Sequence, residues 1–144
     1  MVSMLPNDKN ITVVTNSLAV LNELLGTDGI NAVSVGGTLR RESTSLLGYL
    51  SGVNMEEFNI NKTFMSGNAI SVERGLMDPS MEEAAFKKKL IAASEEVILL
   101  ADNHKFTRLS TYKVCAIDAF DEIITDNKDI DVSELTDTRV TVVY

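Results

Sequence analysis

Residues 11–25 read ITVVTNSLAVLNELL, and the hydrophobic pattern changes in the middle of this stretch. The first five residues form a short apolar, β-branched run, which is typical of a buried strand. Asn16 and Ser17 then offer side chains that cap a helix, and four leucines follow at helical spacing. The stretch therefore predicts a strand followed directly by a helix.

The same alternation continues along the chain. Five further apolar runs are predicted to be strands: residues 32–37, 62–67, 97–101, 122–126 and 139–144. One helix is expected from about residue 43 to residue 53, and another from the capping box SMEE at residues 80–83 to about residue 94. Most strands are continuously apolar, which is typical of parallel strands that are buried on both sides. We therefore predict an α/β fold with an open, mostly parallel sheet and helices on both faces.

Length and charge limit the classes of protein to consider. A chain of 144 residues with 44% hydrophobic residues fits a single domain over residues 1–144. Its 13 basic and 21 acidic residues give a formal net charge of −8. Binding of nucleic acid by bulk electrostatics is not expected, because it needs a clustered basic face. The nearest basic cluster, Lys87-Lys88-Lys89, follows two glutamates in the same predicted helix and is interpreted as a solvated helix face. No apolar run approaches the roughly 18 residues of a membrane span and no signal peptide is recognisable, so a cytoplasmic location is expected.

The single cysteine and the single histidine limit the chemistry further. Cys115 has no partner for an internal disulfide, and its apolar neighbours predict a buried, inert thiol. His104 follows a predicted strand and is interpreted as a surface residue of a loop, with a catalytic role as the alternative. With one residue of each type, a metal site rich in cysteine or histidine is excluded. No metal ion and no cofactor is expected.

Polar residues follow the first two predicted strands, and in open parallel sheets ligands bind at the carboxyl ends of the strands. Thr15-Asn16-Ser17 would place hydroxyl and amide groups at a helix N-terminus, which favours an anion, although an ordinary helix cap explains them too. The segment GGTLRRES brings two glycines, the hydroxyl of Thr38, and Arg40 beside Arg41. Guanidinium groups suit phosphate, and a tight turn with surface arginines is the simpler alternative.

The next two strands also end in polar groups. Asn68, after the third strand, can donate to and accept from a polyol, and it is also a favoured turn residue. Asp102 and Lys105, after the fourth, are either a salt bridge or ligand groups. Together the strand ends describe a site for a small anion that carries hydroxyls. A sugar phosphate fits, with Lys105 and Arg40 near the phosphate and Asp102 and Asn68 at the hydroxyls.

Five stretches, in this order, resemble the carboxyl-terminal effector-binding domain of DeoR-family transcriptional repressors: ITVVTNSLAVLNEL, GGTLRRESTSLLG, GNAISVERGLMDPSMEEAAFKKKLI, VILLADNHKF and FDEIITD. The resemblance runs from about residue 10 to residue 127. It implies a fold like that of ribose-5-phosphate isomerase and glucosamine-6-phosphate deaminase. It also implies a sensor of phosphorylated sugars that controls a bacterial operon of carbohydrate metabolism.

The resemblance also implies the effector pocket. The residues at the family's pocket positions are Thr15, Asn16, Ser17, Gly36, Gly37, Gly67, Asn68, Asp102 and Lys105. Arg40 is added from phosphate chemistry, and Thr38 is added for its hydroxyl after the second predicted strand. No catalytic residue is assigned.

Two departures from the family pattern matter. Full-length members begin with a winged helix-turn-helix that this sequence does not supply, so contact with DNA is expected only through that absent domain. The family's sensor domain also begins with a strand and an Asp-x-Gly-Thr-Thr loop that would precede Met1. We therefore expect an amino-terminally truncated domain that lacks the first strand, with compensation by strand exchange, dimerisation or a rearranged sheet. An oligomer of identical chains is expected.

The main alternative is a sugar-phosphate isomerase or deaminase of the same fold. The isomerases resembled here carry a Gly-Ala-Asp-Glu segment, which reads Gly-Asn-Ala-Ile at residues 67–70, and Asn68 cannot take a proton from carbon. Their Arg-Glu-Lys run corresponds to about residues 86–88, Phe-Lys-Lys, which lack the acid. We therefore predict a sensor rather than an enzyme. A plain assembly domain with an idle pocket is a third possibility.

Overall fold

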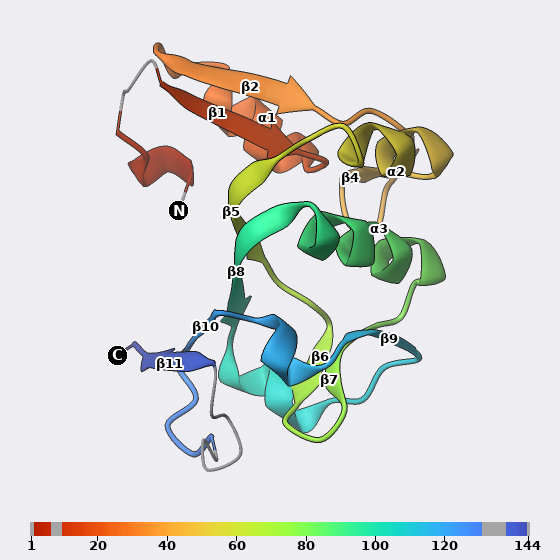
Figure 1. The fold of residues 1–144 in the computed structure, drawn as a ribbon, viewed down its shortest axis with the longest axis vertical. Helices are drawn as coiled ribbons and strands as arrows, with labels where there is room; N and C mark the ends of the chain where they lie inside the picture. The colour runs from red at the N-terminus through yellow and green to blue at the C-terminus, as the bar shows by residue number, and fades with distance from the viewer. Residues whose placement is uncertain (1, 7–9, 131–137, 144) are drawn as a thin grey trace. The chain divides into compact units, whose positions relative to one another are not determined.

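The computed structural model describes residues 2–6, 10–130 and 138–143 of the chain. It divides into two compact units, Met1–Glu57 and Phe58–Tyr144, and each is described by itself (Figure 1). The predicted single domain over residues 1–144 stays a prediction. Among the described residues, none of the helices combines the length and the apolar character needed to cross a membrane.

The first unit is built on a strand–helix–strand element. After the short 3-10 helix η1 (Val2–Met4), strand β1 (Ile11–Thr15) runs parallel to β2 (Ile30–Ser34), with Ile11 opposite Ile30. Helix α1 (Leu18–Leu24) connects the two strands. An antiparallel hairpin comes next, made of β3 (Thr38–Arg40) and β4 (Ser45–Leu47), and it leads into helix α2 (Tyr49–Met55).

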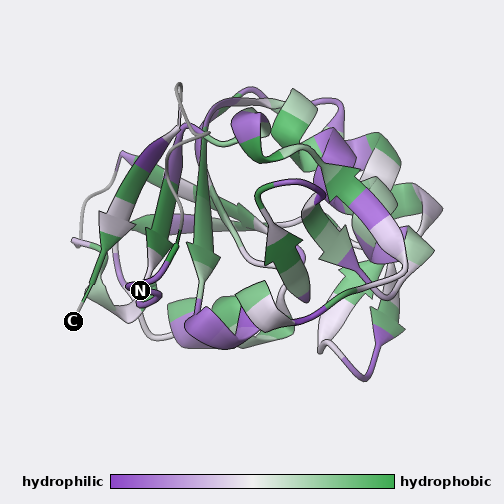
Figure 2. Cartoon of the chain, turned by 90° about the horizontal axis from the view of Figure 1, so that it is seen from below, coloured by the Kyte–Doolittle hydropathy of each residue, from purple (hydrophilic) through white to green (hydrophobic). Residues whose placement is uncertain are grey.

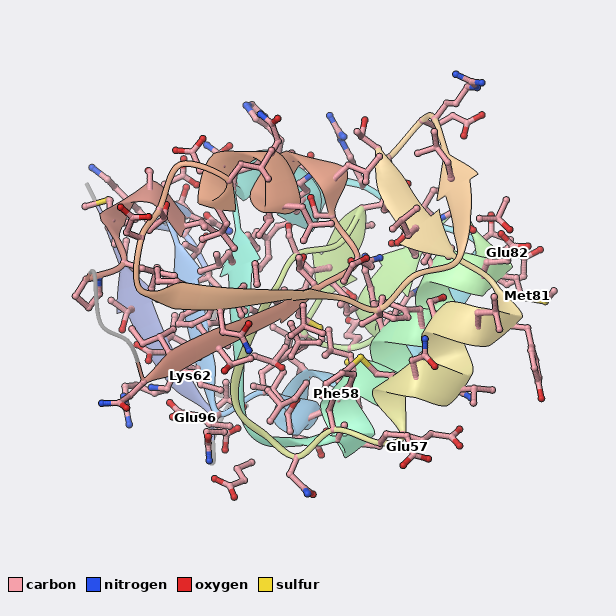
Figure 3. The ribbon with its side chains drawn as sticks, turned by 90° about the horizontal axis from the view of Figure 1, so that it is seen from above. Glu57, Phe58, Lys62, Met81, Glu82 and Glu96 are labelled. Atoms are coloured by element: carbon pink, nitrogen blue, oxygen red, sulfur yellow. The ribbon has the colours of Figure 1, made fainter. Side chains whose placement is uncertain are left out.

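The second unit holds a parallel sheet of four strands in the order β11-β10-β8-β5. Their bounds are Ile60–Met65 for β5, Ser94–Ala101 for β8, Glu122–Thr125 for β10 and Arg139–Val142 for β11. Lys62 and Glu96 are register partners on β5 and β8, and their side chains form an ion pair of 2.9 Å (Figure 3).

A smaller antiparallel sheet in this unit has the order β6-β7-β9. Its strands are Ala69–Ser71 (β6), Gly75–Asp78 (β7) and Tyr112–Cys115 (β9). Helix α3 (Met81–Ala92) packs against β7, β8 and β9. The 3-10 helices η2 (Asn103–Thr107) and η3 (Ile117–Ala119) flank β9 in the sequence.

The core of the second unit forms where the apolar strands meet α3 and the smaller sheet. Hydrophobic residues dominate several of the strands (Figure 2). The buried members of this core are Met65, Ile70, Leu76, Ala84, Val97, Leu99, Ala101, Val114, Ile117, Phe120 and Ile123. Burial of this kind is the main favourable term in folding, which is why continuously apolar runs become the central strands.

The α/β class and the mostly parallel sheet are confirmed, and so are several local predictions. Strand β1 has the predicted bounds, and Ser80 caps α3 by accepting a hydrogen bond from the Glu83 N–H at 3.3 Å. The strand predicted over residues 32–37 lies instead at Ile30–Ser34. The last strand was predicted over residues 139–144 and ends at Val142 in the structure. Tyr144 lies outside the described residues.

The helix predicted from residue 43 was wrong at its start. The chain forms the β3–β4 hairpin instead, and the helix begins only at Tyr49. The hairpin turn places Thr44 at a φ of 51°, a left-handed conformation that does not continue a helix. Ser45 and Leu47 then alternate toward the interior, as strand residues do.

Candidate functional site

The loop after β1 carries the first group of predicted site residues. The Thr15 hydroxyl accepts a hydrogen bond from the Ser17 N–H at 3.1 Å, and the Ser17 hydroxyl accepts from the Val20 N–H at 3.3 Å. Ser17 is therefore the N-cap of α1, as its position before the leucines predicted. The observed hydrogen bonds are those of an ordinary helix cap, which was the alternative to an anion site. A ligand role for Thr15, Asn16 and Ser17 stays a prediction.

The hairpin holds this loop through main-chain hydrogen bonds. The Leu46 N–H donates to the Asn16 carbonyl at 2.8 Å, and the Leu18 N–H donates to the Thr44 carbonyl at 3.1 Å. Ser17 and Ser45 form an antiparallel bridge between these bonds. Two N–H groups of the first helical turn, those of Leu18 and Val20, are thus already bonded within the protein.

Gly36 and Gly37 lie beside that loop because β1 and β2 are parallel and in register. The Val35 N–H donates to the Thr15 carbonyl at 3.1 Å, just before the two glycines. Gly36 has a φ of 70° and Gly37 a φ of 118°, both rare for residues with a side chain. A Cβ atom on Gly37 would lie 2.6 Å from the Leu47 carbonyl oxygen. Close packing against the hairpin therefore explains this glycine without a ligand.

Thr38 and Arg40 lie on β3 within the hairpin. Thr38 is the register partner of Leu47, and Arg40 is that of Ser45, which is itself bridged to Ser17. The Arg40 Nε lies 3.5 Å from a carboxylate oxygen of Glu42, and 30% of the arginine side chain is exposed. The first unit thus brings the ends of β1 and β2 together and places Arg40 one strand away from Ser17.

In the second unit, Gly67 and Asn68 connect β5 to β6. The Asn68 N–H donates to the Met77 carbonyl at 3.2 Å, which continues the pairing of β6 with β7. A Cβ atom on Gly67 would overlap the buried Leu76 side chain. Gly67 is therefore needed for packing, and the half-buried Asn68 is placed by the backbone of the hairpin.

Asp102 and Lys105 lie just after β8, the neighbour of β5. The Asp102 carboxylate caps η2 by accepting from the His104 N–H at 3.0 Å. The Lys105 Nζ lies 4.0 Å from the other carboxylate oxygen of Asp102, with 24% of the lysine and 49% of the aspartate side chain exposed. Since hydrogen bonds from N–H groups are shorter than about 3.2 Å, this ion pair is long and leaves the ammonium group able to donate elsewhere.

These four residues lie at one end of the second unit. Strands β5 and β8 are parallel, with Met65 opposite Leu99, so the chain leaves both strands at the same edge of the sheet. Helix η2 also packs against β6, the strand that begins directly after Asn68. The structure therefore brings Gly67, Asn68, Asp102 and Lys105 to one edge, as the strand-end argument predicted.

Sequence reasoning did not single out Asp126, Asp78 and Lys87, which make defined contacts in this unit. The Asp126 carboxylate, at the end of β10, accepts a hydrogen bond from the Asn103 N–H at 2.6 Å. The Lys87 Nζ lies 2.7 Å from an Asp78 carboxylate oxygen, and only 15% and 8% of these side chains are exposed. Lys87 was interpreted as part of a solvated helix face, and the structure corrects this. Its partner Asp78 lies nine residues earlier on a strand, so no short-range sequence pattern indicates this ion pair.

The one cysteine and the one histidine of the sequence lie in different surroundings. Burial raises the pKa of the Cys115 thiol to about 11, so the thiol stays protonated near neutral pH and is a poor nucleophile. His104 lies in η2 with an exposed side chain. Within residues 2–6, 10–130 and 138–143, no group of three or more His, Cys, Asp or Glu residues is arranged to hold a metal ion.

Comparison with known proteins adds the wider context. The sequence model of a protein family described as the DeoR C terminal sensor domain matches residues 1–127. Relatives of the chain are named as regulators of transcription. The uncharacterised HTH-type transcriptional regulator YulB of Bacillus subtilis is 33% identical over 127 residues, which cover 88% of this chain and 49% of the relative.

Two further relatives come from other organisms. The HTH-type transcriptional regulator GlpR of Haloferax volcanii is 37% identical, with 84% of this chain and 47% of the relative covered. The transcriptional repressor AccR of Agrobacterium fabrum is 32% identical, with 85% and 48% covered. The chain thus spans about half the length of the curated relatives it matches.

Proposed function

Because this chain belongs to the DeoR C-terminal sensor domain family, we propose that it binds a phosphorylated sugar and serves as the effector-binding domain of a transcriptional repressor. The repressor would control an operon of carbohydrate metabolism, and this chain would act on DNA only through a helix-turn-helix domain. The chain would work as an oligomer of identical subunits in the cytoplasm.

One observation carries this proposal: the edge of the second unit where Asn68, Asp102 and Lys105 gather. Lys105 supplies a cation, and its Nζ lies 4.0 Å from a carboxylate oxygen of Asp102. An ammonium group with free donors is a suitable partner for a phosphate. Asp102 and Asn68 add acceptors and an amide that suit the hydroxyls of a sugar. Thr38, Arg40 and the loop after β1 lie in the first unit, and their ligand role stays a prediction from the sequence.

The same edge favours binding over catalysis. Isomerisation of an aldose to a ketose needs a base over the substrate carbon, commonly a carboxylate. Asn68 stands where the resembled isomerases have acids, and Asp102 is engaged in capping η2. We therefore propose a sensor without catalytic residues, and the isomerase or deaminase remains the second candidate. Turnover of a ribose or hexose phosphate that disappears in an Asp102→Asn variant would favour the enzyme.

Signalling would come from a shift between two arrangements of the full repressor. The sugar phosphate must bind the arrangement with low DNA affinity better than the repressing one. A tenfold preference corresponds to about 1.4 kcal/mol of coupling free energy.

The first test is a thermal-shift titration of the chain with phosphates of fructose, tagatose, galactitol, deoxyribose and glucosamine. The unphosphorylated sugars serve as controls. A ligand at about 100 times its dissociation constant should raise the free energy of unfolding by roughly 2.7 kcal/mol. A shift with one phosphorylated sugar supports the proposal, and no shift with any of them contradicts it for this chain.

Lys105→Ala tests the proposed phosphate contact. Loss of a charge-assisted hydrogen bond should weaken binding of the sugar phosphate by about 1.5–3 kcal/mol. Lys88→Ala, which removes an exposed lysine from α3, is the matched control and should leave the affinity unchanged. Equal affinities of the wild type and the Lys105 variant would remove Lys105 from the site.

A further inference from the structure

Asp126 lies at the carboxyl end of β10, directly beside the segment that carries Asp102 and Lys105. Strands β8 and β10 are parallel, and Ala101 and Thr125 are the last pair in register. Beyond this pair the chain leaves β8 and turns into η2 at Asn103. The Asp126 carboxylate accepts the Asn103 N–H at 2.6 Å, so a side chain at the end of one strand holds the first residue of the helix after the neighbouring strand.

This hydrogen bond is a contact between distant segments, unlike the other bonds of η2. The His104 N–H donates to the Asp102 carboxylate and the Lys105 N–H to the Asp102 carbonyl, both within the same short segment. Local bonds shape the helix but do not fix it to the sheet. The bond to Asp126 instead joins residues that are 23 positions apart in the sequence. Its acceptor is a carboxylate, which makes it stronger than a hydrogen bond between two neutral groups.

The carboxylates at the ends of β8 and β10 each accept a hydrogen bond from a backbone N–H group of η2. One oxygen of Asp126 is bonded to the Asn103 N–H, and one oxygen of Asp102 is bonded to the His104 N–H. Backbone amides therefore engage the carboxylates at both strand ends. Among the described residues, the carboxylate oxygen nearest to the Lys105 Nζ belongs to Asp102 and lies 4.0 Å away.

We propose that Asp126 is a positioning residue of the sensor: it fixes η2 to the sheet so that Lys105 is held in place to bind the anionic group of the effector. This inference rests on the proposed function. It goes further by assigning a role to the residue that directly follows β10 and does not itself touch the ligand. Asp126 is exposed, so its substitution should leave the fold intact.

Hydrogen exchange of backbone amides tests the positioning without any ligand. In Asp126→Ala, exchange of the Asn103 amide should become about tenfold faster, because the bond no longer protects it. Asp126→Asn keeps an acceptor oxygen and should restore most of the protection. Asp129→Ala removes an exposed aspartate three residues on and should change nothing. Unchanged exchange of Leu99 and Ile123 in the core would show that the fold is intact. Unchanged exchange of Asn103 overturns the inference.

Binding of the same five sugar phosphates, measured by calorimetry, tests the link to Lys105. Asp126→Ala should weaken the phosphate that binds by about tenfold, whereas in a Lys105→Ala background the same change should weaken it less than about twofold. Equal losses in both backgrounds overturn the inference. If the wild type binds a probe and Asp126→Ala binds it equally well, this inference alone fails. If the wild type binds none of the probes, the proposed function fails and this inference with it.

Discussion

Replacement of Lys87 by methionine should destabilise the second unit by about 3 kcal/mol, because it leaves a buried carboxylate without its cation. The Lys87 Nζ lies 2.7 Å from an Asp78 carboxylate oxygen. Asp78 lies on β7, the central strand of the smaller sheet, and its other oxygen accepts the Ser80 N–H at 3.3 Å. Methionine has nearly the length of lysine, so loss of packing contributes little.

The magnitude is set by burial. Removal of one partner from a buried ion pair costs about 3–5 kcal/mol, whereas exposed pairs contribute about 0–1 kcal/mol. Only 8% of the Asp78 side chain and 15% of the Lys87 side chain are exposed, so the lower end of the buried range applies. The ion pair between Lys62 and Glu96 has a similar distance, 2.9 Å, but exposed fractions of 48% and 34%. Lys62→Met should therefore cost less than about 1 kcal/mol.

Urea unfolding of the wild type, the two methionine variants, Asp78→Asn and the double variant Asp78→Asn/Lys87→Met measures these differences. The double variant should be less destabilised than the sum of the single changes by about 1–3 kcal/mol, because it leaves no isolated charge. The reasoning is refuted if Lys87→Met costs no more than Lys62→Met. It is also refuted if the single changes add without coupling.

Other contacts give three further predictions. Gly37→Ala should lower the free energy of unfolding by at least about 1–3 kcal/mol, because a Cβ atom there would lie 2.6 Å from the Leu47 carbonyl oxygen and the φ is 118°. Gly26→Ala is the control and should be near neutral, because a Cβ atom there would meet open space. Ser80→Ala should cost about 1 kcal/mol by loss of the α3 cap, and Ser80→Asp should retain most of it, as measured by urea unfolding. For Cys115, the thiol pKa of 9.0 when unfolded rises to about 11 in the fold, so the folded chain holds the proton more tightly. This stabilisation is present below pH 9.0 and is lost as the pH rises through about 11, a loss that should be absent from pH-dependent urea unfolding of Cys115→Ala.

The elements that could be predicted from the sequence are those with local signals. The apolar run of β1, the cap at Ser17 and the capping box at Ser80 each act within a few residues, and the structure shows all three. The family prediction is also confirmed, and it rested on motifs spread over most of the chain. Local chemistry and motifs spread along the chain were therefore sufficient to predict the fold class.

The elements that were missed depend on partners far away in the sequence. The strands of the smaller sheet have three or four residues each, and β7 pairs with β9 across the whole of α3 and β8. Leu46 lies in a strand because its N–H bonds to Asn16, thirty residues earlier in the sequence numbering. Hydrophobic periodicity over so few residues does not separate strand from helix.

The candidate site shows the same division. The strand-end rule found Asn68, Asp102 and Lys105, which the structure places at one edge. It did not find Asp126 or the pair of Asp78 with Lys87, because each contact joins two separate elements. A rule based on the residues directly after each strand identifies the polar groups at that edge, but it does not identify the groups that hold them.

The way in which the hairpin holds the loop after β1 determines which sequence changes the hairpin can tolerate during evolution. Both bonds, from Leu46 to Asn16 and from Leu18 to Thr44, join main-chain atoms that every residue except proline supplies in full. Substitutions in the hairpin turn can therefore accumulate, except at Thr44, where the φ of 51° favours glycine or asparagine. One inserted or deleted residue would instead shift the register of the hairpin, and the donors and acceptors of both hydrogen bonds would no longer face one another. Among relatives, the number of residues between the two hairpin strands should be kept more faithfully than their identity.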